Sequence, residues 1–180
     1  MPEELGKGDE VPRPTSAGGT SGDARRVMAV ASLGGHWVQL MRLTPAWDGC
    51  EVTYVTTSPD LEAEVQAEAA DRAQPPPRFF AVREANRWQK LRLVASFLQI
   101  LAIVLRTRPE VIVTTGAAPG YFAVRIGSVL GIRTVWIDSI ANAEEISLSG
   151  RKAGRYAGLW LTQWPHLARE EGPDYRGSVI

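Results

Sequence analysis

Short apolar runs alternate along the chain with segments in which apolar residues recur every three or four positions. The runs are rich in valine, isoleucine and alanine, and they predict buried strands at residues 25–32, 51–58, 78–82, 110–116, 132–139 and 158–164. The segments with helical spacing predict helices at residues 35–47, 59–73, 86–109 and 118–131. Strands that alternate with helices pair in parallel, with helices on both faces of the sheet. The pattern therefore predicts an α/β fold with a Rossmann-like, doubly wound, mostly parallel sheet.

Local signals place the ends of these helices. The first is expected to offer Val38, Leu40 and Met41 to the core. The long third helix is ended by Pro109, because proline cannot continue a helix, and the fourth is closed by Gly131.

The first 24 residues differ in composition from all that follows. They are rich in glycine, proline, serine, threonine and acidic residues and lack apolar periodicity, so we expect a disordered tail at residues 1–24 and one Rossmann-like domain at residues 25–180. The formal net charge of +0 gives no electrostatic reason to expect nucleic acid as a partner. The single cysteine, Cys50, cannot form an internal disulfide, which fits a reducing compartment. We expect neither a secretory signal nor a membrane-spanning helix.

Three loops at predicted strand ends are candidates for chemistry, because ligands of doubly wound sheets bind beyond the carboxyl ends of the strands. The first runs from Ser32 to His36. Its Gly34 and Gly35 let backbone N–H groups approach an anion such as a diphosphate, and His36 can act as a base or a hydrogen-bond donor. The G-x-G-x-x-G dinucleotide fingerprint and the P-loop pattern are both missing. A tight turn with a histidine that caps the helix explains the same residues, so both interpretations stay open.

The other two loops carry weaker signals. Residues 114–120 form a second turn of small residues, in which Thr115 and Gly116 either bind an anion or acceptor or simply allow close packing. In residues 138–142, Asp138 with Ser139 either belongs to a site or has a structural role. Asn142, Glu144 and Glu145 are expected in solvent.

The long helix has a wider apolar surface than one sheet face requires. Val94, Phe97, Leu98, Leu101, Val104 and Leu105 follow the spacing of an amphipathic helix. Either it packs as an ordinary crossover helix, or part of it lies in a membrane interface with bases nearby. Three tryptophans either anchor that interface or fill the core: Trp37, Trp47 and Trp88.

Four motifs then occur in an order that is typical of one family. They read VASLGGHWVQLMRL, RPEVIVTTGAAPGYFAV, TVWIDSIANAEEISLSGR and LWLTQWP. Together they resemble the glycosyltransferase-subunit family that includes the membrane-recruiting subunit of the dolichol-linked GlcNAc transferase and bacterial exopolysaccharide-biosynthesis subunits. The resemblance covers about residues 26–180.

This resemblance implies the N-terminal half of a GT-B glycosyltransferase, peripheral at the cytoplasmic face of the cell membrane. Such a half binds a polyprenyl-diphosphate-linked acceptor, while a separate GT-B C-terminal-like subunit binds the UDP-sugar, and it is inactive without that partner. No metal or other cofactor is implied, because GT-B enzymes stabilise the leaving diphosphate with helix dipoles and side chains. His36 would be the catalytic base or an acceptor contact. The residues implied in acceptor and phosphate binding are Ser32, Gly34, Gly35, Thr115, Gly116, Asp138 and Ser139.

Two features depart from the family pattern. An acidic tail stands where eukaryotic relatives have an N-terminal membrane anchor. Asp138-Ser139 stands where bacterial relatives often have Glu-Ser, so the carboxylate is one methylene shorter. Two other functions remain in competition: a non-catalytic membrane scaffold that recruits a soluble transferase, and a stand-alone nucleotide-binding Rossmann domain.

Overall fold

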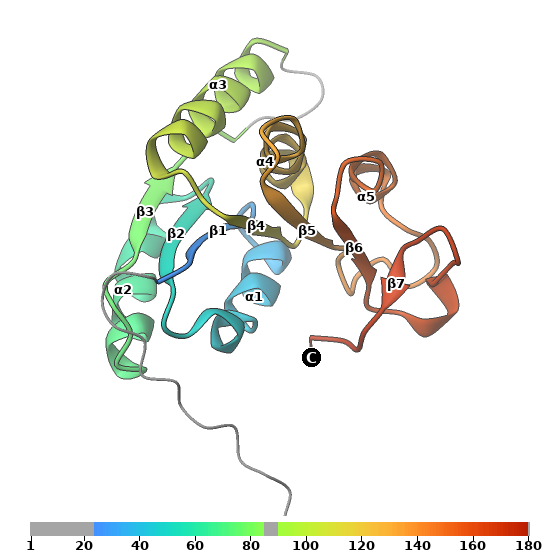
Figure 1. The fold of residues 1–180 in the computed structure, drawn as a ribbon, viewed down its shortest axis with the longest axis horizontal. Coiled ribbons are helices and arrows are strands. Elements are labelled where there is room, and N and C mark those ends of the chain that lie inside the picture. The colour runs from blue at the N-terminus through green and yellow to red at the C-terminus, as the bar shows by residue number, and fades with distance from the viewer. Residues whose placement is uncertain (1–23, 85–89, 180) are drawn as a thin grey trace, which may run out of the picture.

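A computed structural model describes residues 24–84 and 90–179 as one parallel sheet with helices on both faces (Figure 1). The predicted tail, except Ala24, and Trp88 lie outside the described residues. The strands are β1 (Arg26–Val30), β2 (Glu51–Thr56), β3 (Arg78–Ala81), β4 (Val111–Thr114), β5 (Arg133–Ile137), β6 (Leu159–Thr162) and β7 (Asp174–Tyr175). The helices are α1 (Gly35–Met41), α2 (Glu62–Asp71), α3 (Lys90–Thr107), α4 (Ala117–Val129) and α5 (Leu148–Ala153), with 3-10 turns η1 (Thr44–Trp47), η2 (Pro59–Leu61) and η3 (Pro165–Leu167).

The strand order β3-β2-β1-β4-β5-β6-β7 is that of a doubly wound sheet, and every neighbouring pair is parallel. The predicted fold is therefore confirmed. The strand order reverses direction between β1 and β4, where Val30 is paired with Thr114. The carboxyl ends of these two strands, and the loops that follow them, consequently lie side by side at the switch point.

Two apolar clusters hold the helices against the sheet. On one face, Ile100, Ile103 and Val104 of α3 pack with α4 over Met28 and Ile112. Helices α1 and α2 lie on the opposite face (Figure 1). The cluster on that side contains Trp37, Leu40, Trp47, Tyr54 and Val65. Helices α1 and α2 thus cover one face and α3 and α4 the other, as right-handed crossovers on either side of the switch point require.

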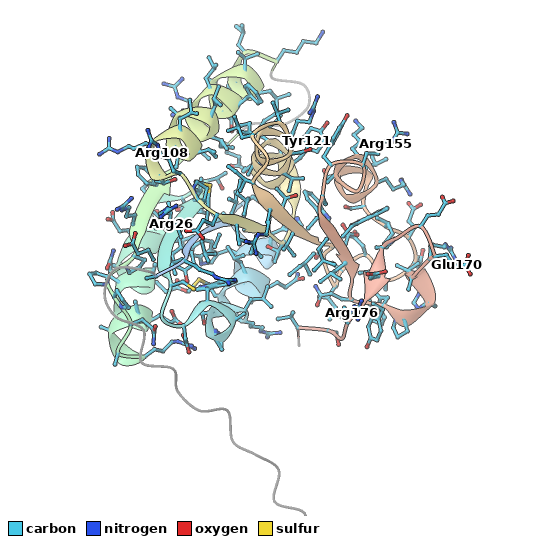
Figure 2. The ribbon with its side chains drawn as sticks, viewed as in Figure 1. Arg26, Arg108, Tyr121, Arg155, Glu170 and Arg176 are labelled. Carbon is cyan, nitrogen blue, oxygen red and sulfur yellow. The ribbon has the colours of Figure 1, made fainter. Side chains whose placement is uncertain are left out.

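Ionic and polar contacts join β1 and β4 at the edge of the sheet where both strands begin. The Arg26 Nε donates to the Arg108 carbonyl oxygen at 2.9 Å, and its guanidinium lies 3.1 Å from Glu110. Arg26 and Arg108 are labelled in Figure 2. These contacts join the segment before β4 to the first residue of β1.

The structure corrects the sequence predictions in three places. The first predicted helix is wrong in its second half, because α1 ends at Met41 and a separate 3-10 turn, with Pro45 as its second residue, begins at Thr44. Val38 was expected in the core but is 52% exposed, and its neighbour Trp37 is buried instead. Helix α5 and strand β7 were not predicted, since six-residue and two-residue elements give too few positions to show a period.

The face of α3 that packs on the core differs from the face that the apolar spacing of the sequence indicated. Ser96 and Thr107 are buried together with Ile100 and Ile103, and Thr107 donates from its hydroxyl to the Ile103 carbonyl at 2.8 Å. An apolar stripe on the same helix is left exposed: Leu91, Val94, Leu98 and Leu105. The two described tryptophans that were candidate membrane anchors, Trp37 and Trp47, lie in the core.

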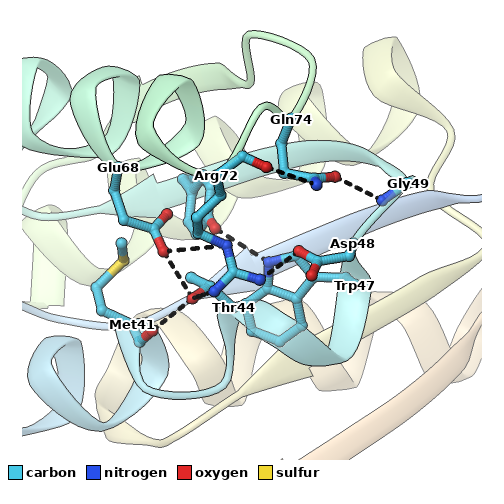
Figure 3. A network of polar contacts seen from close by, with 9 residues as sticks. Met41, Thr44, Trp47, Asp48, Gly49, Glu68, Arg72 and Gln74 are labelled. Atoms are coloured by element: carbon cyan, nitrogen blue, oxygen red, sulfur yellow. Dashed lines mark hydrogen bonds and ion pairs between the residues drawn. The ribbon is translucent and has the colours of Figure 1, made fainter.

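A polar network connects the loop after α1 with the end of α2 (Figure 3). The Arg72 guanidinium pairs with Asp48, lies 3.6 Å from Glu68 and donates to the Thr44 hydroxyl at 3.4 Å. Beneath it, the Trp47 indole N–H donates to the Tyr54 hydroxyl at 3.0 Å. The network holds the segment that leads into β2 against the end of α2.

Tyr54 makes the stability of the fold sensitive to pH in the alkaline range. Burial raises the pKa of Tyr54 from 10.0 to about 12. Because the folded pKa lies above the unfolded one, this stabilisation is complete below pH 10.0 and is lost as the pH rises to about 12. The loss amounts to about 2–3 kcal/mol. Urea unfolding from pH 9 to 12 should therefore show a steeper decline for the native chain than for Tyr54→Phe. Parallel declines would contradict the assignment.

Candidate functional site

Two turns at the switch point share an unusual backbone. Gly34 precedes α1 with a φ of +94°, and Gly116 precedes α4 with a φ of +130°. Glycine adopts such angles without the steric cost that a side chain incurs. Ala117 follows Gly116 with a φ of +62°, which is strained for a residue with a Cβ. Both turns bring the chain sharply from a strand end into a helix at one end of the sheet.

His36 connects the two turns. Its ring Nδ1 lies 2.8 Å from the Thr115 carbonyl oxygen, and the Thr115 hydroxyl donates to the His36 carbonyl oxygen at 2.7 Å. The two residues are 79 positions apart in sequence, and only the pairing of β1 with β4 brings them together. His36 is half-buried, whereas Thr115 is fully buried.

The first turn faces open space. A Cβ built on Gly34 or on Gly35 would meet no atom within 4 Å, and both glycines are exposed. The turn is fixed from below, because the Leu33 N–H donates to the Thr57 hydroxyl at 3.0 Å. The following amides belong to the first turn of α1 and have no carbonyl four residues earlier in the helix. This arrangement suits the close approach of an anion to backbone N–H groups.

The second turn is closed rather than open. Gly116 is buried, and a Cβ there would lie 2.7 Å from Cε1 of His36. Its own N–H donates to the Thr114 hydroxyl at 3.1 Å, and a Cβ on Gly120 would collide with that same hydroxyl. Of the two interpretations of this loop, the geometry favours close packing around His36.

Asp138 is buried at the end of β5 and serves its own loop. One carboxylate oxygen accepts from the Ser147 hydroxyl at 2.6 Å and from the Trp136 indole at 3.2 Å. The other accepts from the Ser147 N–H at 2.9 Å and from Asn142 at 3.2 Å. Both carboxylate oxygens accept hydrogen bonds, and 2% of the residue is exposed. The carboxylate therefore fixes the conformation of the loop at residues 139–147. Asn142, expected in solvent, is half-buried in this cluster, while Glu144 and Glu145 are exposed as predicted.

Ser139 belongs to a buried polar chain that the sequence analysis missed. The Gln39 amide donates to the Ser139 hydroxyl at 2.9 Å, and its carbonyl oxygen accepts from the Gln163 amide at 2.6 Å and the Ile140 N–H at 3.0 Å. Gln163 in turn accepts from the Val179 N–H at 2.8 Å. The available signal was a glutamine within a predicted helix, three residues after the histidine.

The predicted site residues thus fall into two groups. His36, which follows Gly34 and Gly35, contacts Thr115 and lies against Gly116 at the switch point, and Ser32 is half-buried two residues beyond β1. Asp138 and Ser139 lie one strand further along and are buried within the β5 loop.

Comparisons with known proteins identify the family of the chain. A family model described as "Oligosaccharide biosynthesis protein Alg14 like" matches residues 27–179. The chain belongs to this family. The relationship inferred from the four motifs is therefore confirmed.

Curated relatives in the family carry a common description. A protein from Eremothecium gossypii, described as "UDP-N-acetylglucosamine transferase subunit ALG14", is 28% identical over 176 residues, which cover 85% of this chain and 79% of the relative. A Mus musculus protein with the same description is 24% identical over 187 residues, which cover 89% of this chain and 86% of the relative.

Solved structures extend the likeness of the fold. Acinetobacter baumannii MurG superposes with a TM-score of 0.64 at 12% identity, and the match covers 86% of this chain but 45% of MurG. A UDP-GlcNAc 2-epimerase from Neisseria meningitidis gives a TM-score of 0.54 at 9% identity, with 77% of this chain and 40% of the epimerase covered. The chain spans less than half the length of these structures, and it has the fold of an N-terminal GT-B half.

The described residues contain no helix that is long and apolar enough to cross a membrane.

Asp138 gives a stability prediction. Asp138→Asn places an amide N–H₂ where hydrogen-bond donors now converge, so we expect a loss of about 2–4 kcal/mol in the free energy of unfolding by urea. The exposed control Asp60→Asn should change it by less than about 0.5 kcal/mol. Equal values for the two variants would refute the role of Asp138 as the anchor of its loop.

Proposed function

We propose that this protein is the acceptor-binding, membrane-associating subunit of a two-component UDP-sugar glycosyltransferase. The observation that carries the proposal is the convergence of an exposed glycine turn and a histidine at the switch point of a GT-B-like half. The acceptor would be a lipid-linked polyprenyl diphosphate, and the product a lipid-linked oligosaccharide or polysaccharide precursor. Its relatives are described as subunits of a UDP-N-acetylglucosamine transferase, which makes UDP-GlcNAc the first donor to test.

The exposed glycine turn would receive the acceptor's diphosphate. Backbone N–H groups at Gly34 and Gly35 offer donors without side chains in the way. An anion there would gain hydrogen bonds that water otherwise supplies. Ser32, two residues beyond β1, would lie at the margin of this site.

His36 would act on the acceptor hydroxyl. In this mechanism its Nε2 takes the hydroxyl proton while the hydroxyl oxygen attacks the anomeric carbon, and the bond to UDP breaks with its electron pair going to the leaving diphosphate. The donor would be held by a separate GT-B C-terminal-like subunit, and transfer would require both chains. Neither a metal nor another cofactor takes part in the proposed step.

The membrane contact is proposed for the free side of α3. Beside its exposed apolar stripe, Val129 and Leu130 at the end of α4 are also exposed apolar residues. Between the two helices lies a cavity of about 390 Å³ lined by Phe97, Leu101, Arg125, Ile126, Val129 and Leu130. Exposed leucines with a base at each end of the helix, Lys90 and Arg106, suit the interface of an anionic membrane. The protein would sit there peripherally, at the cytoplasmic face.

The catalytic part is tested in the complete complex. The tagged chain is purified from detergent-solubilised membranes of its own cells, co-purifying proteins are identified by mass spectrometry, and transfer from labelled UDP-GlcNAc to a polyprenyl-diphosphate acceptor is measured. His36→Ala should lower kcat about 10²- to 10⁴-fold. Gly35→Val should raise KM for the acceptor, because its side chain occupies the space above the turn.

His166→Ala is the matched control, since it removes the other histidine, and it should leave kcat unchanged. Full activity of both His36→Ala and Gly35→Val would instead favour a scaffold that only recruits the transferase. Recovery of the chain alone from the soluble fraction would contradict the two-subunit proposal.

The membrane part is tested by flotation with vesicles of phosphatidylglycerol and phosphatidylcholine. The double variant Leu91→Glu/Leu98→Glu should bind about 10²-fold more weakly, because each buried leucine contributes about 1.5 kcal/mol or more. Leu148→Glu, at an exposed leucine on α5, should bind as the native chain does. Equal binding by all three proteins would place the contact elsewhere.

A further inference from the structure

We propose that Thr115 and Gly116 are positioning residues for His36, rather than contacts for the acceptor. They hold the imidazole in one tautomer and one orientation, so that Nε2 is the free basic nitrogen. The inference rests on the proposed role of His36 in transfer, but its geometric part can be measured without any activity.

The tautomer follows from the partner of Nδ1. A backbone carbonyl oxygen can only accept a hydrogen bond. The 2.8 Å contact from Nδ1 of His36 to the Thr115 carbonyl therefore requires the proton on Nδ1. In the neutral ring, Nε2 then carries a lone pair and no proton. Among the described residues, Nε2 of His36 has no hydrogen-bond partner, so this lone pair is available to a substrate.

Thr115 also holds the backbone of His36 in place. The Thr115 hydroxyl donates to the His36 carbonyl at 2.7 Å, so that two hydrogen bonds join the two residues in opposite directions. Thr115 is fully buried at the end of β4 and has little freedom to move. The acceptor for Nδ1–H is consequently fixed by the sheet itself.

Gly116 supplies the wall against which the ring lies. A Cβ at this position would be 2.7 Å from Cε1 and 2.9 Å from Nδ1 of His36. Any side chain there must push the imidazole out of place. The φ of +130° adds a second reason for glycine.

The arrangement keeps His36 ready for proton transfer. A base that is already oriented loses no time or free energy in finding the reactive geometry, and a misplacement of about 1 Å can cost about 10²-fold in rate. A neutral carbonyl fixes the tautomer without placing a negative charge beside the acceptor's diphosphate, as a carboxylate would.

The second histidine provides an internal reference. Nε2 of His166 lies 2.7 Å from the Ala143 carbonyl oxygen, so the same reasoning puts its proton on Nε2. The chain has 2 histidines, and they are expected in opposite neutral tautomers. Nitrogen NMR of the full chain labelled with ¹⁵N-histidine, above the pH at which both rings lose their charge, distinguishes these tautomers directly.

Three variants then test the positioning. Gly116→Ala should change the His36 nitrogen and ring-proton shifts and lower kcat in the assembled complex by about 10²-fold, with little change in KM for the donor. Thr115→Val, which removes only the hydroxyl, should lower kcat about tenfold, and Thr115→Ser should restore it. Gly49→Ala is the control, because Gly49 also has a positive φ but no atom lies within 4 Å of its Cβ site. It should alter neither the His36 shifts nor kcat.

The outcomes separate this proposal from the proposed function. A His36 spectrum with the proton on Nε2, or one that Gly116→Ala leaves unchanged, overturns the positioning role. Displaced His36 signals with an unchanged kcat overturn it as well. If His36→Ala is then fully active, the catalytic role of the histidine also fails; if His36→Ala is inactive, only the positioning role does.

Discussion

Parallel pairing of β1 with β4 is the constraint on which the candidate site depends. It sets Val30 beside Thr114. The segments that follow the two strands therefore leave the sheet as neighbours, and they turn at Gly34 and Gly116. From that point the contact between His36 and Thr115 needs no further long-range element. The register of two short strands thus brings together groups that are 79 residues apart in the sequence.

The polar groups at the carboxyl edge divide into two kinds. Gln39, Ser139, Gln163 and Asp138 are buried and use their hydrogen-bonding groups on one another and on the backbone. Such a satisfied network gives the loops one arrangement, since an alternative packing would leave buried groups without partners. The exposed glycine turn, in contrast, keeps donors free. The open turn, supported by this network, is the surface for which we propose the diphosphate contact.

The helices on the two faces of the sheet differ in how many apolar side chains they expose to solvent. On the side of α1 and α2, aromatic residues are buried and a surface network around Arg72 closes the edge. On the side of α3 and α4, leucines remain exposed although more polar positions of the same helix are buried. This exposed apolar stripe is the surface for which we propose the membrane contact.

The sequence by itself determined the class of fold, the six longer strands and the two glycine turns, because strand and helix periods and glycine positions are local properties. It also determined the family, through four motifs that lie far apart. Only the tertiary structure decided which turn is open and which is closed, that Asp138 binds groups of its own loop, and that Gln39 joins α1 to the loops after β5 and β6. These outcomes depend on which side chains meet across strands. The single-helix prediction at residues 35–47 failed because Pro45 and the burial of Trp47 outweighed the apolar period. The exposed stripe of α3 was ambiguous for the same reason: periodicity shows that a helix has apolar faces, while the neighbours decide which of them is covered.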